Sequence, residues 1–399
     1  MECVQVNDPK SKISIQNLVK VFGDRPRSAL EGLRQGKTRD QIQAETGQVV
    51  AVSDVSFDIA RGELFVIMGL SGSGKSTLIR CINSLIPATS GHVFIDDDDV
   101  AHVNEAKLRE IRRTKVTMVF QKFALFPHRS VAENVEYGLK VRGMSPKERR
   151  EKALVTLEQV GLAQWADYKP SALSGGMQQR VGLARALATD AEILLMDEAF
   201  SALDPLIRRE MQDELLRLQA ELQKTIVFIS HDIQEALKIG DRVAILKDGA
   251  LVQIGTPEDI VVRPANDYIA AFTQDVNRAQ VLKTGTILRK IPPYVLGKGG
   301  LEHALDHLQR HECKVLYVVD QQQRPVGYIT DEQLIRAVQE GDRDIQQVME
   351  TNFSTVPKSS CLEEVLSLCN SDCPLAVVSE EGQFQGVVEQ SDIFAHLVA

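Results

Sequence analysis

Long hydrophobic runs and paired cysteines are both missing from the sequence. Its longest apolar stretch, ELFVIMGL at 63–70, is far shorter than the roughly 20 residues that a membrane-spanning helix needs. The first ten residues do not resemble a secretory signal. The cysteines have no zinc-type spacing and indicate reduced thiols in a cytosolic protein; they stand at positions 3, 81, 313, 361, 369 and 373. Work at a membrane would therefore require a partner.

The excess of positive charge that is typical of nucleic-acid-binding proteins is also missing. The formal net charge is −9, and seven acidic residues but no Lys or Arg follow Lys358. We expect no nucleic-acid partner, and we expect the last part of the chain to carry uncompensated negative charge.

Hydrophobic patterning indicates an α/β domain in the first two thirds of the 399 residues. Continuous apolar runs at 64–69, 192–198 and 225–230 are typical of strands buried on both faces of a parallel sheet. Helices and alternating strands are predicted around them, as expected for an α/β sheet. The helices are at 76–85 and 206–223, and the alternating strands are at 13–22 and 49–59.

An internal repeat occupies the rest of the chain. Residues 316–335 align with 375–394 at a constant offset of 59 positions, and each copy reads strand, turn, strand, helix. Two copies of one small α/β unit are therefore expected to pack on each other. We predict a first domain at 1–275 and two repeats at 281–340 and 341–399.

The segment GLSGSGKST at 69–77 fits the pattern of a phosphate-binding loop and lies where that loop must lie, between a buried strand and a helix. Its glycines allow a tight turn with inward N–H groups, and the helix N-terminus adds a positive dipole. Lys75 would reach the nucleotide phosphates, and the Ser76 hydroxyl would bind Mg²⁺. The predicted ATP-binding residues here are Gly69, Ser71, Gly72, Gly74, Lys75, Ser76 and Thr77.

A second strand, ILLMDE at 193–198, brings two acids to the same edge of the sheet. Asp197 is placed to hold Mg²⁺ through water, and Glu198 could polarise an attacking water as a general base. A lone acid at the end of a strand is more often a surface residue, but the loop at 69–77 favours the catalytic interpretation. ATP and Mg²⁺ are the expected cofactors.

The segment LSGGMQQR at 173–180 resembles the signature sequence of ABC-transporter ATPases. The resemblance covers essentially the full chain. It implies a P-loop NTPase fold of the ABC type with a helical signature subdomain at about 122–190. It also implies an adenine-stacking aromatic, a catalytic and Mg²⁺-binding glutamine, an ATP-contacting aspartate and a catalytic switch histidine, which are Phe22, Gln121, Asp204 and His231.

The same segment predicts a second anion site. Ser174 is a good helix N-cap, and Gly175 and Gly176 leave backbone N–H groups uncovered at the helix N-terminus. In the family this site closes on the γ-phosphate held by another subunit's loop. The resemblance therefore implies a head-to-tail homodimer with two composite ATP sites. An ordinary glycine-rich cap is the alternative interpretation.

Three features resemble the ATPase subunit of glycine betaine/proline (quaternary amine) importers: the insertion at 24–47, the segment at 198–215, and repeats similar to a tandem CBS pair. The resemblance implies two membrane permease subunits, a periplasmic or lipid-anchored substrate-binding protein, and a peripheral place on the cytoplasmic face of the cell (inner) membrane. The segment 121–139 would receive the permease, although its apolar residues could instead pack locally; these are Phe123, Leu125 and Phe126.

The repeats depart from the adenosine-binding CBS pattern, in which Asp follows Thr or Ser by three residues. The first copy has Thr330 but Gln333, and the second has Glu389 but Asp392. A structural or electrostatic role is therefore favoured. An anionic membrane surface would repel the acidic end, and salt shortens the screening length from about 10 Å at 0.1 M to about 3 Å at 1 M. The repeats could thus gate transport by ionic strength.

Two clusters carry metal-binding residue types but favour other interpretations. His303, His307 and His311 recur every four residues near Cys313, and we expect a polar helix face. The run DDDD at 96–99 is expected to be a solvated turn.

Two other functions stay open: a soluble ABC-type ATPase not coupled to transport, such as one of DNA maintenance, and a sensor acting mainly through the repeats. DNA-maintenance relatives insert a long coiled coil between loop and signature. Here 99 residues separate Lys75 from Ser174, without heptads. Co-purification with a membrane permease would separate the three functions.

Overall fold

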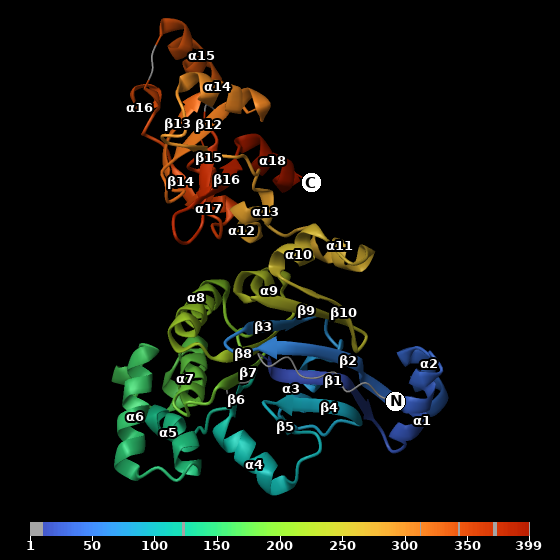
Figure 1. The fold of residues 1–399 in the computed structure, drawn as a ribbon. Coiled ribbons are helices and arrows are strands. Elements are labelled where there is room, and N and C mark those ends of the chain that lie inside the picture. The colour runs from blue at the N-terminus through green and yellow to red at the C-terminus, as the bar shows by residue number, and fades with distance from the viewer. Residues whose placement is uncertain (1–10, 122–123, 312, 342–343, 370–372, 399) are drawn as a thin grey trace. The chain divides into compact units, whose positions relative to one another are not determined.

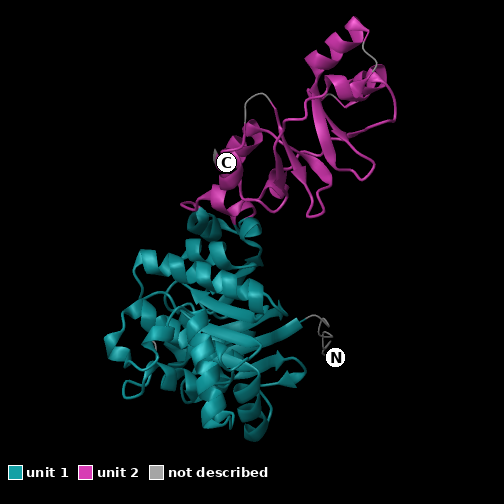
Figure 2. Cartoon of the chain, turned by 90° about the vertical axis from the view of Figure 1, so that its left-hand side faces the viewer, with its two compact units in different colours: residues 1–260, 264–273 teal, residues 261–263, 274–399 magenta. Residues whose placement is uncertain are grey.

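The computed structural model describes residues 11–121, 124–311, 313–341, 344–369 and 373–398. The chain divides into two compact units, residues 1–260 with 264–273 and residues 261–263 with 274–399 (Figure 2). Each unit is built around its own sheets and its own hydrophobic clusters.

A six-stranded sheet carries the first unit, in the order β10-β9-β3-β8-β7-β6 (Figure 1). The three predicted apolar runs form its central strands β3, β8 and β7, and every residue within these strands is buried, because helices and a second sheet cover both faces. All neighbours in the sheet are parallel except β10, which pairs antiparallel with β9. The strands are β3 (Leu64–Met68), β6 (Val116–Val119), β7 (Ile193–Asp197), β8 (Thr225–Ser230), β9 (Arg242–Lys247) and β10 (Ala250–Gly255).

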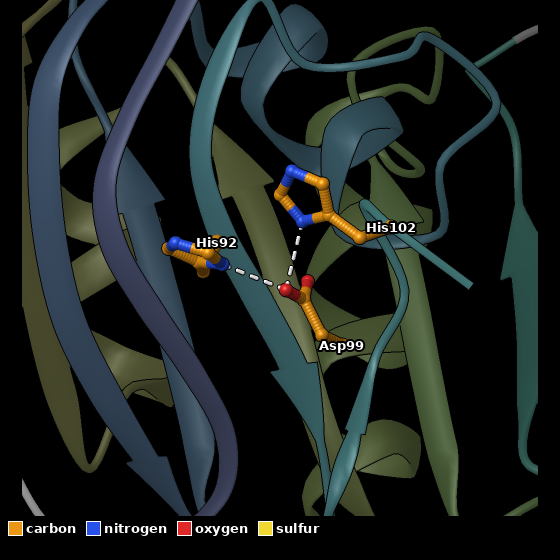
Figure 3. A group of neighbouring side chains, drawn as sticks. All are labelled: His92, Asp99 and His102. Atoms are coloured by element: carbon orange, nitrogen blue, oxygen red, sulfur yellow. Dashed lines mark hydrogen bonds and ion pairs between the residues drawn. The ribbon is translucent and has the colours of Figure 1, made fainter. Parts of the chain in front are cut away.

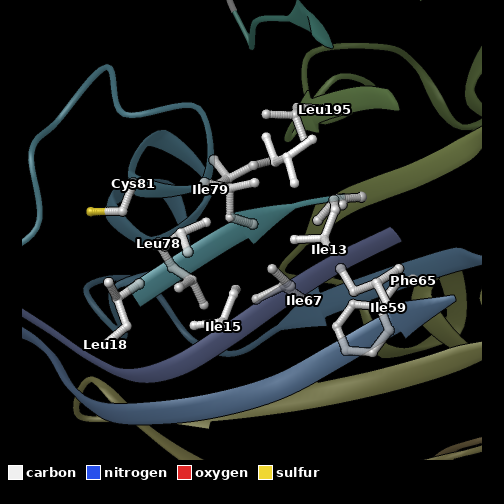
Figure 4. Close-up of a cluster of buried hydrophobic side chains, with 14 of the residues drawn as sticks. Ile13, Ile15, Leu18, Ile59, Phe65, Ile67, Leu78, Ile79, Cys81 and Leu195 are labelled. Atoms are coloured by element: carbon white, nitrogen blue, oxygen red, sulfur yellow. The ribbon is translucent and has the colours of Figure 1, made fainter. Parts of the chain in front are cut away.

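A four-stranded antiparallel sheet, in the order β2-β1-β4-β5, contributes to the same core. Its strands are β1 (Ser11–Phe22), β2 (Val49–Ala60), β4 (Ser90–Ile95) and β5 (Asp98–Asp99). Helix α3 (Lys75–Ile82) supplies Leu78 and Ile79 to this core, where they meet Ile15 from β1 and Ile67 from β3 (Figure 4). The core therefore fixes the start of α3 relative to the ends of the parallel strands.

The insertion at 24–47 is folded rather than a simple polar interruption. It forms α1 (Pro26–Arg34) and α2 (Arg39–Thr46), which lie together beside β1 and β2 (Figure 1). Ala29 and Ile42 are fully buried in a small cluster with residues of both strands. Leu30 and Leu33 of α1 are partly buried against the same cluster, so a small apolar face docks the two helices.

The other helices of the first unit complete its layers. Helices α5, α6 and α7 pack on one another and form the green group in Figure 1. The bounds are α4 (Glu105–Thr114), α5 (Val131–Val141), α6 (Pro146–Gln159), α7 (Gly175–Leu187), α8 (Pro205–Leu222), α9 (Ile233–Ile239), α10 (Pro257–Val262) and α11 (Asp267–Thr273), with short 3₁₀ turns at Ala163–Trp165 and Pro170–Ala172.

The second unit repeats one topology twice. In each half a short strand pairs parallel with the first strand of an antiparallel hairpin, and the pairs Val318–Gly327 and Val377–Gly386 occupy the same register position. The strands are β11 (Tyr294–Val295), β12 (Val315–Val319), β13 (Pro325–Thr330), β14 (Thr355–Pro357), β15 (Leu375–Val378) and β16 (Phe384–Val388).

The two halves pack on each other through an aromatic cluster. The Tyr317 ring stacks on Phe384 with centroids 5.2 Å apart, and its hydroxyl donates to the carbonyl of Pro374. The surrounding helices are α12 (Arg278–Val281), α13 (Thr284–Ile287), α14 (Leu301–Arg310), α15 (Asp331–Glu340), α16 (Ile345–Val348), α17 (Leu362–Leu366) and α18 (Gln390–Val398).

The run at 96–99 does turn the chain between β4 and β5, but it is not simply solvated as predicted. Asp96 pairs with Lys12, Arg61 and Lys115 at 2.6–2.8 Å. One oxygen of Asp99 accepts from Nδ1 of His92 at 2.7 Å and of His102 at 2.8 Å (Figure 3). These hydrogen bonds give each of the three side chains a partner within the chain.

The histidines of α14 are hydrogen-bonded within the repeat. Nδ1 of His303 lies 3.3 Å from the Tyr294 hydroxyl, and Nε2 of His307 lies 3.2 Å from the carbonyl of Pro292. Among the described residues, they do not converge with other metal-binding side chains.

Candidate functional site

The loop between β3 and α3 has a backbone that requires glycine. Gly69, Gly72 and Gly74 have φ of 154°, 79° and 96°, which side chains disfavour. A Cβ at Gly69 would also lie 2.3 Å from the Leu246 carbonyl oxygen, and one at Gly74 would lie 2.1 Å from that of Ala51. The loop is thus pressed against β2 and β9 at two points.

Lys75 begins α3 and folds back over this loop. Its Nζ donates to the carbonyls of Gly69 at 2.7 Å and Leu70 at 3.1 Å, and the side chain is only 4% exposed. Burial lowers the pKa of Lys75, while the negative charges of Glu198 and Asp197 oppose that shift. The loop therefore holds the positively charged Lys75 ammonium group at its centre.

Ser76 and Asp197 place two possible oxygen ligands for a metal ion next to Lys75. The Ser76 hydroxyl donates to Oδ1 of Asp197 at 2.8 Å, and the carboxylate is 2% exposed at the end of β7. Arg80 of α3 donates to the other carboxylate oxygen at 3.0 Å. A hydroxyl and a carboxylate are the hard ligands that Mg²⁺ takes, so these residues fit the expected ion.

Glu198 is the point at which the predicted catalytic residues converge. Its carboxylate lies 3.8 Å from Nζ of Lys75, accepts from Nε2 of Gln121 at 3.0 Å, and lies 3.5 Å from Nδ1 of His231. Its φ is 46°, a strained value for a residue with a side chain. Because β6, β7 and β8 are parallel neighbours, the segments that follow them meet at one sheet edge.

The predicted signature residues Ser174, Gly175 and Gly176 stand at the start of α7 and belong to a different segment from the loop at 69–77. Ser174 caps α7, and its hydroxyl accepts from the Met177 N–H at 3.3 Å. A Cβ at Gly176 would lie 2.5 Å from Cγ2 of Ile207 on α8, so close helix packing also requires this glycine. Within the described residues, no hydrogen bond or ion pair joins 174–176 to the loop at 69–77.

Asp204 and Phe22 are both at the surface of the first unit. The Asp204 carboxylate caps α8 by accepting from the Ile207 N–H at 3.1 Å. Phe22 ends β1 with 41% of its surface exposed, and Nζ of Lys20 lies 5.0 Å from the centre of its ring. Phe22 therefore presents an accessible aromatic ring next to the insertion.

Three residues of this region were not predicted. Ser73 lies inside the glycine-rich motif, and its buried hydroxyl has no hydrogen-bond partner among the described residues. Arg80 could have been inferred from its place one turn after Ser76 in α3. Arg39 donates to the Gly72 carbonyl at 3.0 Å from the insertion, and no sequence signal indicated that contact.

The segment expected to meet a permease is partly packed on itself. Phe123 lies outside the described residues, whereas Leu125 and Phe126 are half-buried. The Phe126 ring contacts Tyr137 of α5 with centroids 4.7 Å apart, and buried Asn134 bonds to both backbone groups of Phe126. Local packing thus accounts for Phe126, as the alternative interpretation allowed.

The positions of the adenosine pattern in the repeats have other partners. Thr330 and Gln333 form a capping box at the start of α15. Arg289 pairs with Glu389 at 2.9 Å and with Asp392 at 3.0 Å. Two of the seven acids after Lys358 are therefore compensated, contrary to the prediction, because the partner cation lies about 100 positions earlier in the chain.

Family models and a full-length relative agree with this geometry. The family model for ABC transporters matches residues 52–201, and that for the CBS domain matches residues 285–340. The glycine betaine transport ATP-binding protein OpuAA of Bacillus subtilis is 46% identical over 99% of this chain and 94% of its own length. The chain belongs to the ABC transporter family.

A second relative and a solved structure extend the likeness. The glycine betaine/proline betaine transport system ATP-binding protein ProV of Escherichia coli is 46% identical over 95% of this chain and 96% of its own. The ATP-binding cassette MJ0796, solved as a dimer in a post-hydrolysis state with ADP and phosphate, is 35% identical with a TM-score of 0.53. It covers 61% of this chain and 98% of its own length.

These likenesses confirm the predicted fold class, an ABC-type P-loop ATPase with C-terminal CBS repeats, and they identify the chain as an ATP-binding subunit with ATPase activity. In the ranges that the structure describes, none of the helices has the length and hydrophobicity needed to cross a bilayer.

Proposed function

We propose that this ABC subunit hydrolyses ATP as a head-to-tail homodimer and thereby powers uptake of glycine betaine, proline or a related quaternary amine. The observation that carries the proposal is the 46% identity to OpuAA over 99% of the chain, repeats included. The chain would lie on the cytoplasmic face of the cell (inner) membrane against two permease subunits. A periplasmic or lipid-anchored binding protein would deliver the solute to them.

The residues around Glu198 are proposed to carry out hydrolysis. The N–H groups of 69–77 and Lys75 would hold the phosphates, and Ser76, Asp197 and Gln121 would hold Mg²⁺, which would supply positive charge to the phosphate oxygens. Glu198 accepts a proton from the attacking water, while Gln121 donates to one oxygen of its carboxylate and His231 lies 3.5 Å from the same oxygen. Phe22 stacks on adenine.

One chain is proposed to be insufficient for the reaction. Ser174, Gly175 and Gly176 cap the γ-phosphate held by the loop of a second chain, and Asp204 caps α8, whose Ile207 packs against Gly176. Supporting this, the described residues of the signature make no hydrogen bond with the loop of their own chain. ATP thus joins two chains, and its hydrolysis releases them.

Contact with the permease is proposed at the segment 121–139. Tyr137 is 37% exposed, and a hollow of about 220 Å³ lies beside it. Its lining carries both signs of charge and consists of Arg129, Glu133, Glu136, Tyr137, Lys140 and Arg149. An exposed aromatic ring next to a polar hollow suits a partner segment with both apolar and charged side chains.

The repeats are proposed to regulate transport through ionic strength rather than through a bound adenine nucleotide. The residues at the adenosine positions are already bonded within the chain. The other five acids after Lys358 still make this end negative, so that an anionic membrane surface repels it at low salt and less at high salt.

Reconstitution tests the proposal. The chain is purified with its permease in vesicles, and ATP-driven uptake of betaine, proline, choline and carnitine is compared with that of a Lys75→Ala variant. ATP-dependent uptake of at least one of these solutes, lost in the variant, is expected. If the chain hydrolyses ATP but never associates with a permease, the proposed role in transport is wrong, and the chain is a soluble ATPase instead.

A further inference from the structure

The insertion is a β-hairpin loop that has grown into two helices. Phe22 and Val49 are paired in the register of β1 and β2, so residues 23–48 occupy the place of a hairpin turn. Buried Gln48 closes the base of this loop, because its Oε1 accepts from the Arg25 N–H at 3.0 Å and its Nε2 donates to the Thr46 carbonyl at 3.1 Å. The insertion therefore begins directly beside the exposed Phe22 ring.

The position of Arg39 within the insertion is fixed. Arg39 is the first residue of α2, whose start is held by a capping box between Thr38 and Gln41. Three residues further on, Ile42 is fully buried against Ala29 and the two strands. The capping box and the buried Ile42 therefore fix the backbone from which the Arg39 side chain extends.

Arg39 reaches the phosphate loop from outside. Its Nη1 donates to the carbonyl oxygen of Gly72 at 3.0 Å, and Arg39 is half-buried in that position. Gly72 has a φ of 79°, and a Cβ at this residue would meet nothing within 4 Å. The middle of the loop at Gly72 is therefore uncrowded, in contrast to Gly69 and Gly74. The Arg39 guanidinium restrains the Gly72 carbonyl through a hydrogen bond.

We propose that Arg39 is a positioning residue of the ATP site, and that through it the insertion forms a wall of that site between the adenine side and the phosphate side. A charge-assisted bond to the outward carbonyl holds the loop with its N–H groups inward before nucleotide arrives, which lowers the ordering cost of binding. The guanidinium also places a positive charge beside the triphosphate. The inference rests on the proposed role of 69–77.

Nucleotide binding by full-length variants tests this inference. Arg39→Gln is expected to weaken binding of a fluorescent ATP analogue about three- to tenfold, with the turnover rate at saturating ATP kept within about twofold, because positioning acts before the chemical step. Arg39→Lys, which keeps the positive charge and can still donate to the Gly72 carbonyl, is expected to recover part of the loss. Arg34→Gln removes a charge from the last residue of α1 in the same insertion and serves as the matched control.

The outcomes separate this inference from the proposed function. If Lys75→Ala weakens ATP binding but Arg39→Gln does not, and both melt at the wild-type temperature, the role of Arg39 is wrong and the loop assignment stands. An equal effect of Arg34→Gln would also overturn it, since charge alone would then suffice. If Lys75→Ala leaves binding unchanged, the loop assignment itself fails.

Discussion

At the scale of single residues, Glu198 is the carboxylate on which the predicted catalytic side chains converge. It sits in a left-handed conformation, and Lys75, Gln121 and His231 approach its carboxylate from three different segments. A strained residue that several contacts hold in one geometry is typical of a functional centre. The position of the carboxylate is therefore set by the fold and not by solvent.

Replacing Glu198 with Gln should separate binding from hydrolysis. The amide keeps the shape but cannot accept a proton, so phosphate release should fall by about 10²–10⁴-fold while ATP binding persists. Single-turnover phosphate release and equilibrium binding measure the two quantities. Glu221→Gln, on the exposed face of α8, is the control and should change neither. Wild-type phosphate release by Glu198→Gln would remove Glu198 from the catalytic role.

The residues that sequence could and could not identify differ in what fixes them. The positive φ angles at Gly69, Gly72 and Gly74 were predictable, because a local motif encodes a local backbone shape. Arg39 was not, since its contact with Gly72 joins segments 33 positions apart through the docking of an insertion. Contacts of that kind depend on tertiary packing, which a motif does not describe.

At the scale of elements, the contact between α7 and α8 gives Gly176 a second reason to be glycine. A methyl group there would overlap Cγ2 of Ile207, so Gly176→Ala should cost about 1–3 kcal/mol of unfolding free energy. In an Ile207→Ala background the same change should cost less than about 0.5 kcal/mol, because the obstructing methyl is gone. Urea unfolding of the four proteins in this cycle measures the coupling. Strictly additive costs would contradict the proposed overlap.

The turn between β4 and β5 connects separate elements through charge. Asp96 accepts from Lys12 of β1 and from Lys115 at the start of β6; burial acts to raise its pKa, but these bonds outweigh it and lower the pKa to about 2. Because the folded value lies below the unfolded one, Asp96 stabilises the fold above about pH 4, and the effect is lost as pH falls toward 2.

Asp96→Asn should therefore destabilise the protein in a pH-dependent way. At neutral pH the loss should be about 2 kcal/mol, and it should shrink once the pH falls below about 4. Urea unfolding at pH 7, and at the lowest pH where both proteins stay folded, provides the comparison. Asp97→Asn changes the exposed neighbouring residue and should have little effect. A pH-independent loss would indicate a role for shape rather than charge.

Strands were predictable where the sequence has a continuous apolar run. The runs at 64–69, 192–198 and 225–230 became β3, β7 and β8 with ends shifted by at most one residue. The insertion was not recognised as two helices, because only Ala29 and Ile42 are its fully buried apolar side chains and only Leu30 and Leu33 pack beside them. Asp96 looked solvated because its partner cations Lys12, Arg61 and Lys115 are 84, 35 and 19 positions away in the sequence.

At the scale of the whole molecule, the proposed head-to-tail homodimer requires two chains for each ATP site. Such a dimer should allow complementation between two inactive variants. In a dimer of two Lys75→Ala chains, the phosphate loop is inactivated in both ATP sites. In a dimer of two Ser174→Arg chains, the signature segment is inactivated in both ATP sites. In a mixed dimer, the two lesions fall in one composite site, and the other site combines an intact loop with an intact signature.

Mixing the two variants in equal amounts should therefore restore ATPase activity. If chains pair at random and each site works independently, about half the dimers are mixed and have one intact site in two, so about a quarter of wild-type activity should return. Steady-state phosphate release of each variant alone and of the mixture, at several total concentrations, measures this. The recovered rate should rise with total protein concentration in the way expected for dimer formation. Full activity of Ser174→Arg alone, or wild-type turnover by a strictly monomeric preparation, would show that one chain completes its own site.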